Sequence, residues 1–526
     1  MTVTVQLFAF NTAIAKELKE RITPDLFDFS KPLGKWEDGI FKMFTPSAYQ
    51  ARYFDWLGSS RGSCIVKAVA GSGKTTTIVY GLRYIPGVEA RNVSAGTFHS
   101  VGYKAILKRL NLNRKIEADS SKVRRIAKTM LVHYEYEMYS DFSVRLVGLA
   151  KGEGIGPLVP DTEQAWQELV NHHDLFIDSD DADEARGVQI ARDLLKQSNL
   201  VAQHGDIDFD DMIYLPLLWR LRLWQNDYVI IDEAQDTNRV RRAIAKLALR
   251  PGGRLIAVGD DRQAIYGFTG ASHDAMDLIS KEFNCTTLPL TVSYRCPKDV
   301  AALVQSNVPE FEVPETAIQG TVKDATVDEM LNVFGPHDAV LCRQTAPLIE
   351  LAFALIAQSR ACVVLGKEIG SGLVSLIKKQ KAQGVDRLQE KLEAYRARET
   401  AKHMAKGEEQ KAEAINDRIA CINTVIENLD ENGRTIPALC AKIEGLFSDA
   451  NGALTLSTMH KAKGREWRRV AILRPELIPS KWARQEWQYK QELNLDYVAK
   501  TRTLEVLYIL TTPLPSRNRV EKKEVA

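Results

Sequence analysis

One stretch of the chain has the composition of a phosphate-binding loop. The run CIVKAVAGSGKTTTIVYGL, residues 64–82, reads as a β-branched strand, a glycine turn and a helix. Gly71 and Gly73 let successive backbone N–H groups face an anion, Lys74 reaches the β and γ phosphates, and Thr75 can ligate Mg²⁺. We predict a phosphate loop at residues 68–76, although Ala68 stands where the usual pattern has Gly and a plain connecting turn is the alternative. The residues expected to hold the nucleotide here are Gly71, Ser72, Gly73, Lys74, Thr75 and Thr76.

Two carboxylates follow a second apolar strand. In DYVIIDEAQDTN, residues 227–238, the run VII ends in Asp232 and Glu233. Side chains at the carboxyl ends of buried parallel strands gather at one edge of a sheet. We expect Asp232 to join Thr75 in holding Mg²⁺, and Glu233 to orient and deprotonate the attacking water. Acidic pairs are usually solvated surface groups, but a pair directly after such a strand in a phosphate-loop protein favours catalysis.

A third strand leads into a loop that combines two kinds of residue. In GGRLIAVGDDRQAIYGFTGAS, residues 252–272, the strand RLIAV precedes Gln263, Tyr266 and Phe268. Gln263 can contact a γ-phosphate, whereas flat rings are platforms on which single-stranded bases stack. Core packing of the two rings is the alternative interpretation.

Six motifs in this order resemble those of the UvrD/Rep-type superfamily 1 DNA helicases. They are AVAGSGKTTT, IIDEAQDTN, VGDDRQAIYGFTGAS, LTVSYRCP, TLSTMHKAKGREW and NLDYVAKTRT. The resemblance implies two RecA-like domains, with ATP in the cleft between them and single-stranded DNA crossing both. It also implies movement in the 3′ to 5′ direction.

The same resemblance assigns further nucleotide contacts. Gln50 in FTPSAYQARYFDWL matches the residue that reads the adenine edge, and Tyr294 matches the ring that stacks on adenine. Arg295 resembles a γ-phosphate contact, Glu466 a ribose contact, and Arg502 the second arginine finger. A cation of that kind stabilises the charge on the transferring phosphoryl group.

A DNA-binding set is implied in the same way, and lysines in it could contact phosphates or simply be solvated. The expected DNA contacts are Phe10, Asn11, Thr97, Phe98, His99, Tyr266, Phe268, Thr458, His460 and Lys461.

The N-terminal segment departs from the family's order. Relatives carry a strand and helix of the form AFNKAIAEEL between the phosphate-loop helix and TFHS, whereas here the helix through Gly81 runs directly into RYIPGVEARNVSAGTFHS. The missing unit resembles LFAFNTAIAKELKERI near the N-terminus. Alternation in VTVQLFAF and the spacing of Ile14, Leu18 and Ile22 suit a strand and then a helix. We expect residues 3–10 to pair inside the first domain's sheet, the alternative being an arm that packs elsewhere or frays.

The fold class that follows is α/β, with two RecA-like phosphate-loop NTPase domains built on parallel sheets. Each domain is expected to carry a helical insertion, and the N-terminal strand and helix are expected to be permuted from their usual place.

A helical hairpin is expected where larger relatives have a whole domain. The apolar spacing that predicts it runs through Val385, Leu388, Leu392 and Tyr395, and later from Ile415 to Ile426. The expected parts are 1–104 (first domain with segment 3–22), 105–205 (helical insertion), 206–287 (rest of the first domain), 288–370 (second domain), 371–450 (hairpin arm), 451–515 (rest of the second domain) and 516–526 (disordered tail).

Composition excludes several other classes. A net charge of +2 on 526 residues means that any nucleic-acid surface must be local, and seven cysteines without a C-x-x-C pair argue against a zinc or iron-sulfur site. Asp208, Asp210 and Asp211 at the start of an expected helix are read as structural. With no apolar run long enough for a membrane span, we expect a cytoplasmic protein of a bacterial or phage-infected cell.

The function expected is an ATP-dependent DNA helicase that uses ATP and Mg²⁺ and acts on single-stranded DNA and duplex junctions. One alternative is a single-stranded DNA translocase that unwinds poorly. Another is a DNA-binding clamp that ATP only switches. A third is that the displaced segment leaves the first domain poorly folded and inactive.

Overall fold

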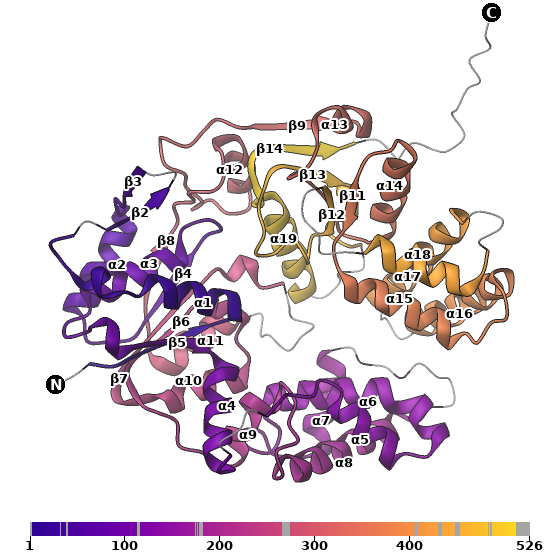
Figure 1. The fold of residues 1–526 in the computed structure, drawn as a ribbon, viewed down its shortest axis with the longest axis horizontal. Coiled ribbons are helices and arrows are strands. Elements are labelled where there is room, and N and C mark those ends of the chain that lie inside the picture. The colour runs from indigo at the N-terminus through magenta and orange to yellow at the C-terminus, as the bar shows by residue number, and fades with distance from the viewer. Residues whose placement is uncertain are drawn as a thin grey trace, which may run out of the picture. The chain divides into compact units, whose positions relative to one another are not determined.

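The coordinates come from a computed structural model. It describes residues 3–31, 33–37, 40–112, 116–173, 175, 177, 182–265, 274–405, 409–429, 434–447, 453–481, 483 and 486–511. The chain divides into two compact units, Met1–Thr291 and Val292–Ala526, here called the first and the second unit. Each unit holds a six-stranded sheet whose strands all run parallel, with helices packed around it (Figure 1). The expectation of an α/β protein with two parallel sheets is confirmed.

The first sheet has the strand order β5-β1-β6-β7-β4-β8. Its interior strands are rich in β-branched and aliphatic residues that are mostly buried on both faces, as in other parallel sheets, whereas the two edge strands are partly exposed. Their bounds are β1 Val5–Ala9, β4 Cys64–Ala68, β5 Val93–Thr97, β6 Asn226–Ile231, β7 Leu249–Gly259 and β8 Thr286–Leu290.

The N-terminal strand is an interior strand of this sheet. Phe8 lies opposite Gly96 of β5 on one side and Ile231 of β6 on the other. Thr4, just before β1, donates its backbone N–H to Asp227 Oδ2 at 2.7 Å, and the N–H of Asp232 donates to the Phe8 carbonyl at 3.0 Å. The expected pairing of the N-terminal segment inside the first sheet is therefore confirmed, for Val5–Ala9.

Helices cover both faces of the first sheet, and several begin at residues suited to capping. Ser47 and Gln50 form a reciprocal capping box at the start of α2, and Thr97 accepts a hydrogen bond from Ser100 N at the start of α4. The helices that pack on this sheet are α1 Thr12–Arg21, α2 Ala48–Ser59, α3 Lys74–Gly81, α4 Phe98–Arg109, α9 Asp211–Leu218, α10 Arg239–Ala248 and α11 Ala275–Phe283.

The segment between α1 and α2 is held against the phosphate-loop helix. It contains the 3-10 helix η1 (Pro24–Phe27) and an antiparallel pair, β2 (Gly34–Glu37) and β3 (Ile40–Met43), which the sequence analysis did not predict. Arg83 donates to the carbonyls of Asp28 and Lys31, at 2.9 and 3.2 Å, and Tyr80 Oη donates to the Gly34 carbonyl at 3.2 Å. These bonds fix the path from α1 back to α2.

Four helices between α4 and α9 form a helical insertion with its own core (Figure 1). They are α5 Lys122–Met130, α6 His133–Glu153, α7 Glu163–His172 and α8 Glu184–Ala202. Trp166, Leu146 and Leu194 are completely buried at its centre. Burial of such side chains contributes about 1.5 to 3 kcal/mol each, so the insertion is stabilised by apolar packing of its own.

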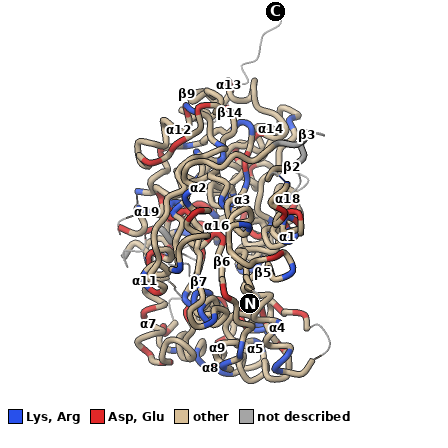
Figure 2. Tube along the Cα trace, turned by 90° about the vertical axis from the view of Figure 1, so that its left-hand side faces the viewer, with Lys and Arg blue, Asp and Glu red and all other residues tan. Residues whose placement is uncertain are grey.

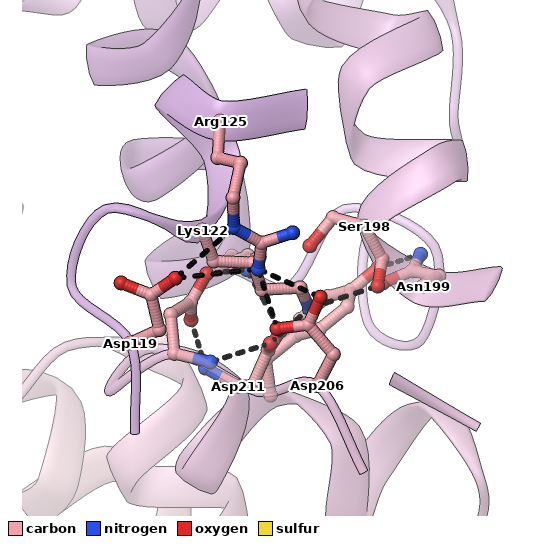
Figure 3. A network of polar contacts seen from close by, with 10 residues as sticks. Asp119, Lys122, Arg125, Ser198, Asn199, Asp206 and Asp211 are labelled. Carbon is pink, nitrogen blue, oxygen red and sulfur yellow. Dashed lines mark hydrogen bonds and ion pairs between the residues drawn. The ribbon is translucent and has the colours of Figure 1, made fainter. Parts of the chain in front are cut away.

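A buried ion-pair network ties the insertion to the start of α9 (Figure 3). Asp211 pairs with Lys122 at 2.6 Å and with Lys151 at 2.7 Å, and Lys151 also pairs with Asp208 at 2.5 Å. Asp208 and Asp211 also accept each other's backbone N–H groups, at 2.8 and 3.0 Å. Two lysines therefore balance two carboxylates, which gives Asp208 and Asp211 the structural role expected from the sequence.

Asp211→Asn should destabilise the first unit by about 3 to 5 kcal/mol, because it leaves two buried lysines with one carboxylate. The matched control is Asp206→Asn, whose side chain is 30% exposed and pairs with Arg125 at the edge of the same network. That change should cost about 0 to 1 kcal/mol. Urea unfolding followed by circular dichroism measures the unfolding free energy of both variants. Equal losses of free energy would show that burial of the carboxylate does not determine the cost of removing its charge.

The second sheet has the strand order β11-β12-β10-β13-β14-β9. Four of these strands lie in apolar runs of the sequence, AVLCR, ACVVLG, RRVAIL and VLYIL. The bounds are β9 Thr321–Ala325, β10 Ala339–Cys342, β11 Cys362–Val364, β12 Leu454–Thr458, β13 Trp467–Leu473 and β14 Thr503–Leu510. The helices that accompany this sheet are α12 Lys298–Gln305, α13 Val327–Val333, α14 Ala346–Ala357 and α19 Glu486–Lys500.

The expected hairpin helices are α16 (Val385–Ala405) and α17 (Glu409–Glu427), and they pack against each other. Two further helices, α15 (Lys367–Lys379) and α18 (Ile436–Leu446), flank them (Figure 1). Leu388 and Ile419 are fully buried in the same apolar core as Val340 of β10. Asp417 accepts the N–H groups of Thr345 and Ala346 at the start of α14. The arm is therefore built into the core of the second unit.

Charged residues of both signs are interspersed along each unit (Figure 2), as the balance of 70 basic and 68 acidic residues implies. None of the helices in the described part of the chain combines the length and the apolar character that a membrane crossing requires.

Candidate nucleotide site and nucleic-acid contacts

The turn between β4 and α3 forms an anion cradle. Gly71 and Gly73 both have φ of 75°, a left-handed conformation that glycine adopts without strain. The backbone then enters α3 at Lys74, so that the free N–H groups of the helix start lie beside the turn. Ser72 is fully buried, and its hydroxyl has no hydrogen-bond partner among the described residues. A buried hydroxyl of this kind fits a site that is completed by a phosphate ligand.

Thr75 and Asp232 meet at the end of the first sheet. Thr75 Oγ1 donates to Asp232 Oδ2 at 2.9 Å, and Asp232 is almost fully buried at the end of β6. Burial and the adjacent Glu233 carboxylate raise the pKa of Asp232 to about 7. A carboxylate and a hydroxyl are oxygen ligands of the type that Mg²⁺ prefers, so the pair fits this cation.

Glu233 lies next to the phosphate-loop lysine. Its Oε1 is 3.3 Å from Lys74 Nζ, and its backbone has a φ of 52°, which is uncommon for a residue with a side chain. Burial lowers the pKa of Lys74, but the carboxylates of Glu233, Asp260 and Asp232 outweigh burial and the pKa is raised. The ammonium group is therefore held charged between the cradle and the carboxylates.

A relay of amide and carboxylate groups connects Glu233 to Gln263. Gln235 donates to Glu233 Oε2 and accepts the backbone N–H of Asp260 at 3.0 Å. Gln263 donates to Asp260 Oδ2 at 2.7 Å. The relay connects the expected base and the expected γ-phosphate contact, which lie just beyond the ends of the adjoining strands β6 and β7. Sequence analysis missed Gln235, although it stands inside the DEAQD run.

Gln50 is buried beside the cradle. Its amide nitrogen donates to Thr77 Oγ1 at 2.9 Å, and its amide oxygen accepts the Ser47 N–H at 2.9 Å. The oxygen and the nitrogen of the Gln50 amide are therefore both fixed, and the side chain of this α2 residue lies beside the first turn of α3. Another contact that the sequence did not suggest comes from α1, since Arg21 donates to Thr76 Oγ1 at 3.1 Å.

The second unit brings together two of the residues assigned to ATP. Arg295 Nε donates to Glu466 Oε2 at 2.7 Å, and the neighbouring Tyr294 is 49% exposed. Arg502 is 1% exposed, and its guanidinium donates to the carbonyl of Val498 at 2.9 Å. The role of Arg502 as an arginine finger stays a prediction, and it requires this guanidinium to change its partners.

The described DNA contacts expected in the first unit lie at the ends of β1 and β5; they are Phe10, Asn11, Thr97, Phe98 and His99. Asn11 caps α1, and Arg241 of α10 lies 5.2 Å from the centre of the Phe10 ring. Phe98 is instead buried, with its ring stacked on Phe8 at a centroid separation of 4.1 Å. Phe98 therefore packs against the sheet, whereas Phe10 is partly exposed. Sequence analysis missed Arg241, which stands just beyond the carboxylate motif.

Two histidines expected at DNA are electrically neutral near pH 7. Burial and then Arg241 lower the pKa of His99 to about 4, and burial and then Arg343 lower the pKa of His460 to about 3. Thr458 is buried at the end of β12, and Lys461 pairs with Glu368 at the start of α15. Tyr266 and Phe268 lie outside the described residues.

His460→Gln should make the protein less sensitive to acid. The folded pKa of about 3 lies below the ordinary value of about 6.5, so the unfolded chain binds a proton first as the pH falls. Stability is therefore lost below about pH 6.5, by about 2 kcal/mol at about pH 5, and the glutamine variant lacks this loss.

Thermal unfolding at about pH 7.5 and about pH 5 checks this, with unfolding free energies derived from each transition. His133→Gln is the control, because that side chain is 86% exposed. If the His460 variant and the control respond alike to pH, the neutral imidazole is not the cause.

Comparisons with known proteins point to one family. The model of the UvrD/REP helicase N-terminal domain matches residues 81–284, and the model of the UvrD-like helicase C-terminal domain matches residues 360–513. The ATP-dependent DNA helicase Rep of Salmonella typhimurium is 31% identical over 287 residues, covering 48% of this chain and 42% of the relative. Rep of Escherichia coli is 29% identical over 290 residues, with the same coverage. DNA helicase II of Haemophilus influenzae is 24% identical, covering 45% of this chain and 37% of the relative. The chain thus matches less than half the length of each of these relatives.

Proposed function

Because the chain belongs to the UvrD/Rep family of superfamily 1 helicases, we propose that it is an ATP-driven motor that moves 3′ to 5′ along single-stranded DNA and separates duplex. The observation that carries the proposal is the hydrolytic set on one sheet edge: the cradle, Lys74, the Thr75–Asp232 pair and Glu233. A DNA-binding clamp that ATP only switches needs no base of this kind. Several turnovers of ATP per protein would exclude the clamp.

The residues have distinct roles in this proposal. Lys74 binds the phosphates, Thr75 and Asp232 hold Mg²⁺, and Glu233 takes a proton from the attacking water. A bound Mg²⁺ would neutralise phosphate charge. Gln235 keeps Glu233 in place, and Gln263 is proposed to contact the γ-phosphate. The roles of Gln50, Tyr294, Arg295, Glu466 and Arg502 rest on their motif matches.

We further propose that β1 and α1 are the strand and helix that relatives carry after the phosphate-loop helix. Two junctions support this. A Cβ placed on Gly87 would lie 3.2 Å from Val3 Cγ2, so the chain after α3 passes the start of β1. At the other end, η1, which follows α1, contacts the 3-10 helix η3 (Ala90–Asn92), which precedes β5. Both junctions support the proposal that this unit takes the place of the strand and helix that relatives carry after the phosphate-loop helix.

The motor is tested by ATP-driven strand separation of two duplexes that differ only in carrying a 3′ or a 5′ single-stranded tail. Unwinding of the 3′-tailed duplex alone, lost in Lys74→Ala, is the expected result. Unwinding of the 5′-tailed duplex would contradict the polarity. ATP turnover without unwinding of either duplex would indicate a translocase rather than a helicase.

One observation favours that second candidate, a translocase that unwinds poorly. Leu388, Ile419 and Asp417 fix α16 and α17 to the core of the second unit. No separate arm domain is then left among the described residues to engage duplex. Translocation and unwinding rates measured on the same preparation separate the two candidates, because a translocase moves at a rate that far exceeds its unwinding.

A further inference from the structure

A groove lies in the first unit at the sheet edge opposite the phosphate loop. It has a volume of about 920 Å³ and is formed where β6 and β7 begin and where α9 and α10 end. The cradle and the carboxylates follow the carboxyl ends of these parallel strands, so the groove is separate from the nucleotide site. The large apolar side chains in its lining are Leu158, Leu217, Leu221, Leu223, Trp224 and Leu247.

Three large apolar side chains of the groove are exposed. Trp224 is 79% exposed, and Leu158 and Leu247 are also exposed. Isolated exposed leucines are ordinary, but an exposed indole and two exposed leucines around one concavity are typical of a binding surface. A volume of this size accommodates several side chains of a ligand.

The charges around the groove are unbalanced. Lys246 pairs with Glu282 at 3.2 Å, and Arg250 pairs with Asp227 at 2.7 Å. Arg220 and Arg222 are both exposed, and the described part of the chain offers neither guanidinium an ion pair. Two uncompensated positive charges therefore stand beside an apolar floor, and they would attract carboxylates.

We propose that this groove binds a short acidic, amphipathic peptide segment of a partner protein. Apolar side chains of the segment would insert against Trp224 and Leu247, and its carboxylates would pair with Arg220 and Arg222. A leucine-lined floor suits apolar side chains better than bases, and the Glu282 carboxylate in the lining disfavours phosphates. The occupant inferred is therefore a protein segment rather than a nucleic acid.

The test uses a fluorescein-labelled helical peptide in which Leu and Phe recur at spacings of three and four among Asp and Glu. Fluorescence anisotropy should show saturable binding to the full chain. Trp224→Ala and Arg222→Glu should each weaken it by about tenfold or more. A peptide with Lys in place of Asp and Glu should not bind.

The matched control is Arg91→Glu, a charge reversal at a 78% exposed side chain on a different segment of the first unit. Because Trp224 and Arg222 are exposed, the variants should keep the wild-type melting temperature, which checks their fold. No binding of the acidic peptide, or equal binding by wild type and both variants, overturns the proposal. A matching loss of affinity for single-stranded DNA in Trp224→Ala also overturns it, since the groove would then serve nucleic acid.

Discussion

Glu233→Gln should lower the steady-state rate of ATP hydrolysis by about two to four orders of magnitude while leaving ATP binding intact. The carboxylate is the base of the proposed hydrolysis, and its position is set by Lys74 at 3.3 Å and by the Gln235 amide. An amide of the same shape keeps one oxygen that accepts a hydrogen bond, but it cannot take the proton. The loss therefore falls on the chemical step.

Phosphate release in the presence of single-stranded DNA measures the rate, and binding of a nonhydrolysable ATP analogue measures affinity. The control is Glu89→Gln, an exposed glutamate that pairs only with Arg91 among the described residues. If the Glu233 variant turns over ATP at the wild-type rate, another group is the base. If the variant loses analogue binding as well, Glu233 serves binding rather than catalysis.

The Asp232 carboxylate differs from that of Glu233, because its burial disfavours the charged form. Burial and then the adjacent Glu233 carboxylate raise its pKa to about 7, although Lys74 and the Thr75 hydroxyl act in the opposite direction. The site therefore holds a group that a cation would stabilise. Burying this carboxylate costs stability but provides a ligand for a cation, which is a common conflict between stability and function at a binding site.

Strong local patterns could be predicted from the sequence. The phosphate loop and the carboxylate pair depend on residues close together in the chain, and the structure joins them through Thr75 and Asp232. The strand β1 was also predictable, because the alternation in VTVQLFAF is a strand signal. Its full burial was not, since a period of two predicts one buried face and the structure buries every residue of Val5–Ala9.

The features that escaped prediction depend on which way a side chain faces. In TFHS, the sequence cannot tell whether Phe98 packs inward, and the structure stacks it on Phe8, a partner 90 residues earlier in the chain. Arg502 is similar, since a motif names the residue but not the Val498 carbonyl that holds it. The groove beside Trp224 combines residues 220–225 with parts of the insertion, α9, α10, α11 and β7, and the sequence does not indicate that these distant segments meet.

The chain order itself yields the prediction with the largest effect on folding. Deleting residues 1–27 should abolish the cooperative unfolding of the first unit. Val5, Leu7, Phe8 and Leu18 are fully buried, and each contributes about 1.5 to 3 kcal/mol by burial. Their sum is comparable with the whole stability of a domain, about 5 to 15 kcal/mol, and the deletion also removes an interior strand.

Moving the segment should repair what deleting it destroys. In the repaired variant, residues 3–27 are inserted between Gly87 and Val88 through short Gly/Ser linkers, in a chain that begins at Asp28. Val3 already lies beside Gly87, and η1 already contacts η3, so both new connections are short. A strand needs only its neighbours, β5 and β6, for its hydrogen bonds. Cooperative unfolding and DNA-stimulated ATP hydrolysis should both return.

The control carries the Gly/Ser linker alone between Gly87 and Val88 in the otherwise unchanged chain, and it should behave like the wild type because long surface loops cost little. Thermal unfolding and ATP turnover are measured on all four proteins. A deleted chain that unfolds like the wild type would mean that β1 is dispensable. If the control is active and the repaired variant is not, the segment depends on its place in the chain, and the proposed permutation is wrong.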